Sequence, residues 1–287
     1  MRRRKAIYIS LAALFILALI LAGIIFHSQN RELKVVFLDV GQGDAILIEQ
    51  GTQQVLIDGG PDGQTLLNEL GKYVPFWDRN IELVMESHPD ADHITGLIDV
   101  LKNYSVGAVM QTSATSDSQT FQKLQDLIKE KNIKIIAGER GEKINLGTDA
   151  KMEILSPGPE TPVNAQDTNA ASIVARLTFG DNSFLFTGDL PSEQEAALIS
   201  AGLNLNSQVL KVGHHGSKYS TSQAFLDAVN PQDAIISVGK NNRYGHPAPE
   251  IMGRLKNKNI NIFRTDEIGD IAYGCTDQQA RCTMVVN

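Results

Sequence analysis

The sequence is short of positive charge, of aromatic side chains and of cysteine. It has 26 lysines and arginines against 33 aspartates and glutamates, a formal net charge of −7, which argues against a protein that binds duplex nucleic acid through a broad basic face. Aromatic residues make up only 6% of the chain, which argues against the long stacking groove of single-strand binders. No repeat, low-complexity tract or linker divides the sequence, so we expect one domain behind one hydrophobic segment.

That hydrophobic segment lies at the N-terminus. Residues Ala6 to Phe26 are uncharged, apolar and preceded by Arg2-Arg3-Arg4-Lys5, and the run is long enough to cross a bilayer core of about 30 Å. The positive-inside rule places the basic start in the cytoplasm and the body outside. We therefore expect residues 1–29 to comprise a cytoplasmic basic start and a single-pass transmembrane anchor in the cell membrane, and residues 30–287 to form an extracytoplasmic domain. Secretion after cleavage of a signal peptide is the alternative, although the run is longer than a usual signal sequence.

The two cysteines, Cys275 and Cys282, flank a polar stretch near the C-terminus. Two strands joined by this stretch could bring the Cβ atoms within bonding distance, and an exported body would permit a disulfide. The alternative is a pair of buried reduced thiols. A zinc site is not expected, because no second ligand pair lies nearby.

Short apolar strands and amphipathic helices alternate through the body. The runs 33–38, 45–50 and 54–57 predict a meander of three strands ahead of the first long helix. Strands and helices then alternate to residue 137, and the same order of meander and strand–helix units returns from residue 143 onward. This repetition predicts an α/β protein with two sheets packed between outer helices.

The most informative motif is His88-Pro89-Asp90-Ala91-Asp92-His93, which places four potential metal ligands within six residues directly after the strand predicted over 81–85. A loop at a strand's end can aim such side chains into one pocket. His88 and Asp90 alternate and can point the same way, whereas Asp92 and His93 can serve a second ion. Two ions about 3.5–4 Å apart can clamp both the attacking and the leaving oxygen of a displacement.

Further candidate ligands follow later strands. Asp189 comes after Gly188, which lets the backbone turn sharply. The pair His214-His215 and the lone His246 each follow a predicted strand. The segment from Asp39 to Asp44 is most simply a tight turn that uses two glycines, with a substrate-facing role for Gln42 or Asp44 as the alternative; it is not a P-loop.

The order of these motifs resembles the metallo-β-lactamase superfamily. Residues 37–45, 87–93, 186–189 and 210–217 are more narrowly similar to the extracellular metal-dependent domain of the ComEC family of competence DNA-uptake proteins. The resemblance covers nearly the whole body and implies an αββα four-layer sandwich that degrades one strand of incoming DNA. Because one apolar segment cannot replace that family's multi-span pore, we expect a free-standing relative.

The sequence departs from the superfamily's usual H-x-H-x-D-H pattern. Asp90 stands where the second histidine is usual, and Asn169 falls where the third histidine of the first site is expected. Exchanging imidazole for carboxylate shifts the preference from zinc toward manganese or magnesium. We expect two divalent ions, Mn²⁺ or Zn²⁺, and better activation by Mn²⁺.

The resemblance implies a role for each site residue. The first ion would take His88, Asp90 and Asn169, and the second Asp92, His93 and His246. Asp189 would bridge the ions, and Asp58 would hold the loop by hydrogen bonds. A metal-activated hydroxide would be the nucleophile, and His214 or His215 would protonate the leaving oxygen or hold the scissile phosphate. The expected substrate contacts are Ser217, Lys218 and Gln42.

Three functions fit these residues. The first is a membrane-tethered or secreted phosphodiesterase, a nuclease acting on single-stranded DNA. The second keeps the same site but acts on a small phosphoester, such as a nucleotide or a cell-envelope phosphodiester. The third is a non-catalytic envelope module with a structural metal. The acidic body does not exclude a polyanionic substrate, because two bound cations would neutralise much of a carboxylate-lined pocket.

Overall fold

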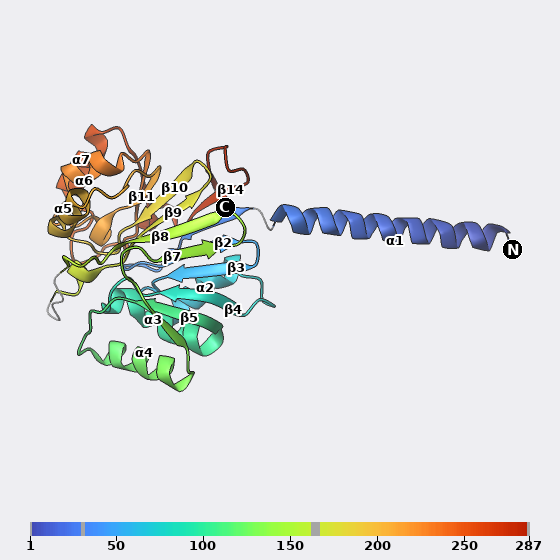
Figure 1. Ribbon diagram of the computed structural model, residues 1–287, viewed down its shortest axis with the longest axis horizontal. Coiled ribbons are helices and arrows are strands. Elements are labelled where there is room, and N and C mark those ends of the chain that lie inside the picture. Colours follow the sequence, from blue (N-terminus) through green and yellow to red (C-terminus); the bar gives the residue numbers. More distant parts are fainter. Residues whose placement is uncertain (1, 30–31, 162–166, 286–287) are drawn as a thin grey trace.

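Two β-sheets lie face to face at the centre of the body, and helices cover their outer faces (Figure 1). The computed structural model describes residues 2–29, 32–161 and 167–285. The predicted arrangement of two sheets between outer helices is confirmed.

The first sheet has eight strands in the order β15-β14-β1-β2-β3-β4-β5-β6. Neighbours from β15 to β3 run antiparallel, and those from β3 to β6 run parallel. The three-stranded meander predicted at the start of the body is confirmed. The strands are β1 (Leu33–Phe37), β2 (Ile46–Gln50), β3 (Gln53–Ile57), β4 (Asn80–Met85), β5 (Ser105–Gln111), β6 (Lys134–Ala137), β14 (Ile271–Cys275) and β15 (Thr283–Val285).

The second sheet has seven strands in the order β13-β12-β11-β10-β9-β8-β7. It repeats the plan of the first sheet, with antiparallel pairing from β7 to β10 and parallel pairing from β10 to β13. The strands are β7 (Lys143–Leu146), β8 (Ala150–Ser156), β9 (Val174–Phe179), β10 (Asn182–Phe186), β11 (Val209–Lys211), β12 (Asp233–Ile236) and β13 (Asn261–Arg264).

Helices on the outer face of the first sheet are α2 (Gly63–Tyr73), α3 (Ala91–Asn103) and α4 (Gln119–Glu130). Those on the second are α5 (Ser192–Ser200), α6 (Gln223–Val229) and α7 (Pro249–Asn257). Three short turns were not predicted: α8 (Thr265–Ile268) and the 3-10 turns η1 (Asn169–Ala171) and η2 (Gly213–Gly216).

The alternation of side chains along β1 shows how the layers are joined. Val35 and Phe37 face the second sheet, where the ring of Phe37 lies 6.1 Å from that of Phe186. Val36 points the other way and packs in one buried cluster with Leu97 of α3. Because successive side chains of a strand point to opposite faces, an apolar strand of this kind can pack against both layers.

The C-terminal hairpin completes the first sheet, because β14 pairs with β1 and β15 with β14. Cys275, at the end of β14, forms a disulfide with Cys282 just before β15. The predicted disulfide is therefore present, and the alternative of two reduced thiols does not hold.

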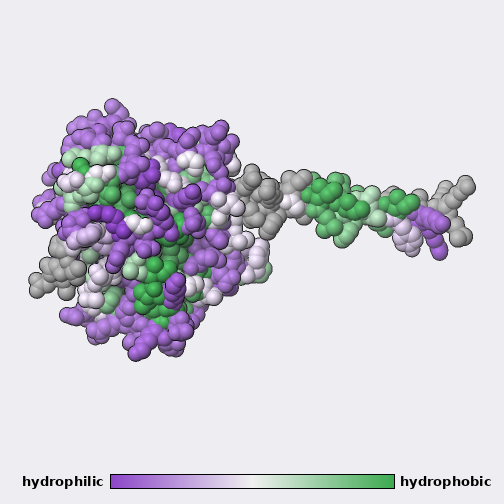
Figure 2. All heavy atoms as spheres, viewed as in Figure 1, coloured by the Kyte–Doolittle hydropathy of each residue, from purple (hydrophilic) through white to green (hydrophobic). Residues whose placement is uncertain are grey.

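Helix α1 (Arg2–Gln29) extends away from the body (Figure 1). Apolar side chains such as Leu14 and Phe15 are exposed along it (Figure 2). Within the described part of the chain, no helix combines the length and the apolar character needed to cross a bilayer. The transmembrane anchor over residues 6–26 stays a prediction.

Candidate metal centre

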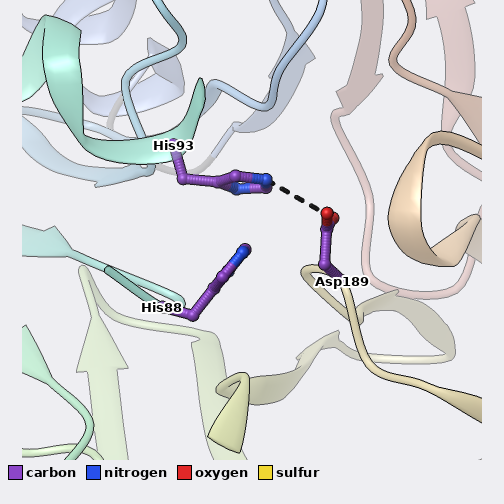
Figure 3. A group of neighbouring side chains, drawn as sticks. All are labelled: His88, His93 and Asp189. Carbon is purple, nitrogen blue, oxygen red and sulfur yellow. Dashed lines mark ion pairs between the residues drawn. The ribbon is translucent and has the colours of Figure 1, made fainter. Parts of the chain in front are cut away.

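The candidate ligands lie on loops that follow parallel strands of both sheets. Asp58 follows β3 and His88 follows β4, whereas Asp189 follows β10 and His215 follows β11. Open α/β sheets bind their ligands at the carboxyl ends of parallel strands. The two sheets bring these ends together, so that His88 and His93 point toward Asp189 from the opposite sheet (Figure 3).

Asp58 anchors the His88–His93 loop. One of its carboxylate oxygens accepts a hydrogen bond from the Ser87 backbone N–H at 2.7 Å, and the other accepts one from the Ser87 hydroxyl at 2.6 Å. The second oxygen also lies 2.8 Å from His93 Nδ1. Such contacts fix the orientation of an imidazole ring that binds a metal. These bonds agree with the predicted supporting role of Asp58.

Two glycines allow α3 to approach the Asp58 loop closely. The Gly59 N–H donates to His93 O at 2.6 Å, and the Gly96 N–H donates to Gly60 O at 3.0 Å. A Cβ atom at Gly96 would lie 1.9 Å from Gly59 O, so no larger residue fits without moving the helix. This contact sets the position of Asp92 and His93, which lie in the first turn of α3.

Among the described residues the candidate ligand atoms form four overlapping groups, two of which contain the buried Asp44. The other two share His93. His88, His93 and Asp189 make one group, and Asp92, His93 and His215 make the other, with all atoms in each group within 4.8 Å of one another. Asp189 touches both groups, because its two carboxylate oxygens lie 3.4 Å from His93 Nε2 and 3.5 Å from His215 Nε2.

The donor atoms of these groups suit a cation. Among the described residues, His88 Nε2, His93 Nε2, His215 Nε2 and Asp189 Oδ1 are buried and have no hydrogen-bond partner. An unsatisfied buried polar atom is costly, and four that converge on one place are the arrangement expected around a metal ion. Neutral imidazole and carboxylate are ligands for both zinc and manganese.

Carboxylates control the protonation of the histidines. Burial alone would lower the pKa of His215, but Asp189 and Asp44 outweigh it and raise the pKa to about 9. Likewise, burial is outweighed by Asp189 and Asp58 at His93, so its pKa lies well above the usual value. Burial and the charge of His93 instead lower the pKa of His88. Since a histidine binds a metal only when its nitrogen is deprotonated, cations would displace protons here.

A model of the metallo-beta-lactamase superfamily matches residues 38–240. The chain belongs to this superfamily. ComE operon protein 3 of Bacillus subtilis is 31% identical over 268 residues, which cover 87% of this chain and 34% of that protein. Competence protein ComA of Neisseria gonorrhoeae is 30% identical over 261 residues, 89% of this chain and 35% of that protein. The predicted resemblance to competence proteins is confirmed, and the chain spans about a third of the length of these relatives.

Solved structures agree on the fold. The metallo-beta-lactamase fold protein YhfI from Bacillus subtilis matches with a TM-score of 0.51 at 14% identity, over 80% of this chain and 95% of that chain. This likeness concerns the fold alone.

Three predicted ligands of this metallo-β-lactamase-fold protein lie at the margin of the two groups. Asp90 occupies the N-cap position of α3, but its side chain makes no capping bond. Instead its carboxylate lies 3.8 Å from His88 Nε2 and accepts a hydrogen bond from Thr168 Oγ1 at 2.5 Å. The neighbouring Asn169 has a buried, unpartnered Oδ1 atom. His246 lies beside His214 with 5.9 Å between ring centroids. The structure does not bring any of the three into the groups around His93.

The paired histidines take different positions. His215 is buried, and its Nδ1 lies 2.9 Å from Ser237 O while its Nε2 faces Asp92 at 3.4 Å. His214 is 31% exposed at its side chain, with Nε2 3.6 Å from Asp189. The geometry therefore makes His215 the better-placed candidate ligand and leaves His214 partly exposed to solvent.

The predicted substrate contacts also differ in accessibility. Lys218 is exposed on the loop after η2, with its ammonium 5.1 Å from the ring of Tyr219. Ser217 is buried, and its hydroxyl accepts a hydrogen bond from the Tyr219 N–H. Gln42 accepts a hydrogen bond from the Gly239 N–H and lines a cavity that also contains Asp92.

Sequence reasoning missed the buried ion pair of Asp44 and Lys211. The Asp44 carboxylate lies 3.4 Å from His215 Nδ1 and 3.9 Å from His93 Nδ1, so one carboxylate contacts histidines from both sheets. Burial would raise its pKa, but Lys211 and His215 outweigh burial and lower it. The signal in the sequence is a lysine inside the apolar run 209–212, because a buried lysine requires a partner.

Proposed function

We propose that the chain is a metal-dependent phosphodiesterase that cleaves single-stranded DNA outside the cytoplasm. The observation that carries this proposal is the convergence of unpartnered histidine and carboxylate atoms between the two sheets. Relatives whose names refer to competence support DNA as the substrate.

Two divalent ions, Mn²⁺ or Zn²⁺, would be held by His88, His93 and Asp189 on one side and by Asp92 and His215 on the other. Asp90, Asn169 and His246 would add outer contacts from the margin of the site. When bound, such ions lower the pKa of water and stabilise negative charge on a phosphoryl oxygen.

The chain's own residues orient the site and move one proton. Asp58 holds His93, and Asp44 contacts His215, so neither ring can turn away from the centre. His214 is the exposed histidine beside Asp189. It would protonate the leaving oxygen of the cleaved strand, and Lys218 would contact a neighbouring phosphate.

A small phosphoester is the second candidate substrate. The acidic composition and a cavity of about 400 Å³ beside Asp92 favour it over a long strand, because pockets for small ligands measure about 300–1,000 Å³.

The test uses the full chain in detergent, stripped with a chelator and reloaded with Mn²⁺ or Zn²⁺. Cleavage of end-labelled single-stranded DNA is followed beside hydrolysis of bis-p-nitrophenyl phosphate. The test variant is Asp92→Asn, and Asp126→Asn on the exposed face of α4 is the control. We expect DNA cleavage that Mn²⁺ supports better than Zn²⁺, lost only in Asp92→Asn.

Other results would redirect the proposal. Hydrolysis of the small ester alone would move the substrate to a nucleotide or an envelope phosphodiester. No hydrolysis of either substrate by metal-loaded protein would indicate a non-catalytic module stabilised by metal. Equal cleavage by Zn²⁺ and Mn²⁺ would contradict the metal preference derived from Asp90.

The proposed location is the outer side of the cell membrane, with α1 as the anchor. The Cys275–Cys282 disulfide supports it, because disulfides persist in oxidising compartments. Protease added to intact protoplasts should degrade the body, whereas protection until lysis would place it in the cytoplasm. Release into the medium would indicate a cleaved signal segment.

A further inference from the structure

The loop between β12 and α7 carries the exposed ring of Tyr244 beside the metal centre. The Asn242 side chain holds this loop from inside: its Nδ2 donates to His246 O at 2.7 Å, and its Oδ1 accepts from the His246 N–H at 3.0 Å and from the Tyr244 N–H at 3.2 Å. Because one side chain satisfies several backbone groups, the loop has a defined conformation although it lies at the surface.

The same loop is fixed against the first sheet. The Gly239 N–H donates to Gln42 Oε1 at 3.1 Å. A Cβ atom at Gly239 would lie 2.7 Å from the Gln42 nitrogen, so only glycine permits this approach. The contact between Gly239 and Gln42 therefore sets the position of Tyr244 relative to the ligands of the first sheet.

The Tyr244 ring is built into a stack yet remains accessible. It lies nearly parallel to the His246 ring, at 14° and 5.8 Å between centroids. The Arg243 guanidinium lies over the ring, 5.1 Å from its centroid, and its Nη2 donates to the Tyr244 oxygen at 3.0 Å. Tyr244 nevertheless keeps 55% of its surface exposed.

Tyr244 and Arg243 line the same cavity as Asp92, a residue of the metal centre. An aromatic surface, a permanent cation and the metal ligands thus border one space of about 400 Å³. A nucleotide has matching parts, because its base stacks on aromatic rings and its phosphate binds arginine.

We propose that Tyr244 stacks one base of the substrate next to the scissile phosphate and that Arg243 binds a phosphate of the same strand. This inference rests on the proposed phosphodiesterase function and selects nucleic-acid single strands over phosphoesters without a base. A duplex does not offer an unstacked base to such a ring, and stacking accepts any base, so we infer single-strand selectivity with little sequence preference.

The test measures binding as well as cleavage. Anisotropy of an end-labelled thymidine oligonucleotide gives Kd for the full chain with Ca²⁺ in place of Mn²⁺, and a gel confirms that the strand stays intact. The variants are Tyr244→Ala, Tyr244→Phe and the control Phe76→Ala. Phe76 is 79% exposed and lies in the loop before β4, at the opposite end of that strand from His88.

We expect Tyr244→Ala to weaken binding about ten-fold, since loss of one stacked base has about that effect, and Tyr244→Phe and Phe76→Ala to bind as the parent does. An abasic strand should bind the parent as weakly as the normal strand binds Tyr244→Ala. Equal Kd for the parent and Tyr244→Ala would overturn the inference, as would a parent that binds no single strand. If Tyr244→Ala cleaves the strand as fast as the parent, the inference about Tyr244 fails but the phosphodiesterase proposal is unaffected.

Discussion

The two halves of the metal centre present their ligands in different ways. In the first-sheet half, His88, Asp92 and His93 come from one continuous hexapeptide, and Asp92 and His93 lie on a regular helix. In the second-sheet half, Asp189 and the pair His214-His215 come from separate loops. The residues of the first half are neighbours in sequence, whereas those of the second half come together only when their separate loops pack against each other.

The second half also has an unfavourable backbone conformation. His214 and His215 have φ values of 49° and 53°, in the left-handed region that side chains other than glycine seldom adopt. Such a conformation costs about 1–3 kcal/mol per residue and persists only where its surroundings enforce it. Here the His214 N–H donates to Gly188 O at 3.2 Å and His215 Nδ1 lies 2.9 Å from Ser237 O. Glu195 accepts hydrogen bonds from the Thr221 and Ser222 N–H groups of the loop that follows. In the first-sheet half Asp58, the residue that holds the His88–His93 loop, also has a positive φ of 58°, so both halves place one or more site residues in the left-handed region.

The strongest test of the comparison removes the residue that joins the halves. Asp189 contacts histidines from both, so Asp189→Ala should abolish binding of both ions and lower kcat/KM about a thousand-fold or more, as expected when a main stabiliser of transition-state charge is lost. Metal content by atomic emission and cleavage rates measure the two effects. Asp181→Asn, in the exposed turn between β9 and β10, is the control. Retention of a full metal complement would contradict this role.

The next largest effect concerns the buried ion pair between the halves. Lys211→Met leaves the Asp44 carboxylate buried without its cation, which should lower the free energy of unfolding by about 3–5 kcal/mol. Lys102→Met removes an exposed partner of Asp99 on α3 and should change the free energy of unfolding by about 1 kcal/mol or less. Denaturant unfolding measures both. Equal effects of the two variants would show that the buried pair has no special importance.

A smaller loss of stability, confined to the second-sheet half, is expected when Glu195 is replaced. The variant Glu195→Gln weakens the bonds that the carboxylate accepts from the Thr221 and Ser222 N–H groups, a loss of about 1–3 kcal/mol. Hydrogen exchange of those two amides should accelerate while the amides of α3 stay protected. Glu193→Gln, exposed on the same helical turn, should leave both regions unchanged. Uniform acceleration would instead indicate global destabilisation.

The smallest expected effect is on the pH dependence of thermal stability, to which His215 and His88 should contribute differently. The folded-state pKa of His215, about 9, lies above the unfolded value near 6.5, so its proton stabilises the metal-free fold below pH 6.5 and this stability is lost as pH rises to 9. His88 has a lowered pKa and adds nothing in that window. The Tm of chelator-treated protein should fall from pH 6.5 to 9, and the rise in Tm on adding Mn²⁺ should grow. His215→Gln should make both trends shallower without abolishing them, because the raised pKa of His93 also contributes, and an unchanged slope in that variant would contradict the assignment.

The fold and the first half of the centre were predictable from the sequence because their signals are local. Apolar runs such as 33–38 and 81–85 became strands, and His88 to His93 stayed together because they are contiguous. Asp189 could be placed because it follows such a strand, whereas the role of Asp58 came from the family resemblance. The partners of these residues could not be derived from spacing: Asp44 and Lys211 are separated by most of the chain, and their contact depends on how the two sheets pack.

The distinction between His214 and His215 has the same origin. Adjacent histidines in a glycine-flanked loop leave the choice of ligand open, whereas the structure distinguishes them by burying His215 and leaving His214 partly exposed. The stack of Tyr244 on His246 likewise depends on a loop that Asn242 holds and that Gln42 positions.

By itself the sequence determined the layers and the hexapeptide of candidate ligands, because periodicity and short spacing act within a few residues. The bond between Cys275 and Cys282, which the sequence left open, was decided by the pairing of β14 with β15. Only the tertiary structure decided which second-sheet groups complete the centre, which buried charges pair and which histidine reaches solvent. These depend on the packing of two sheets, which places side chains distant in sequence within a few ångströms of each other.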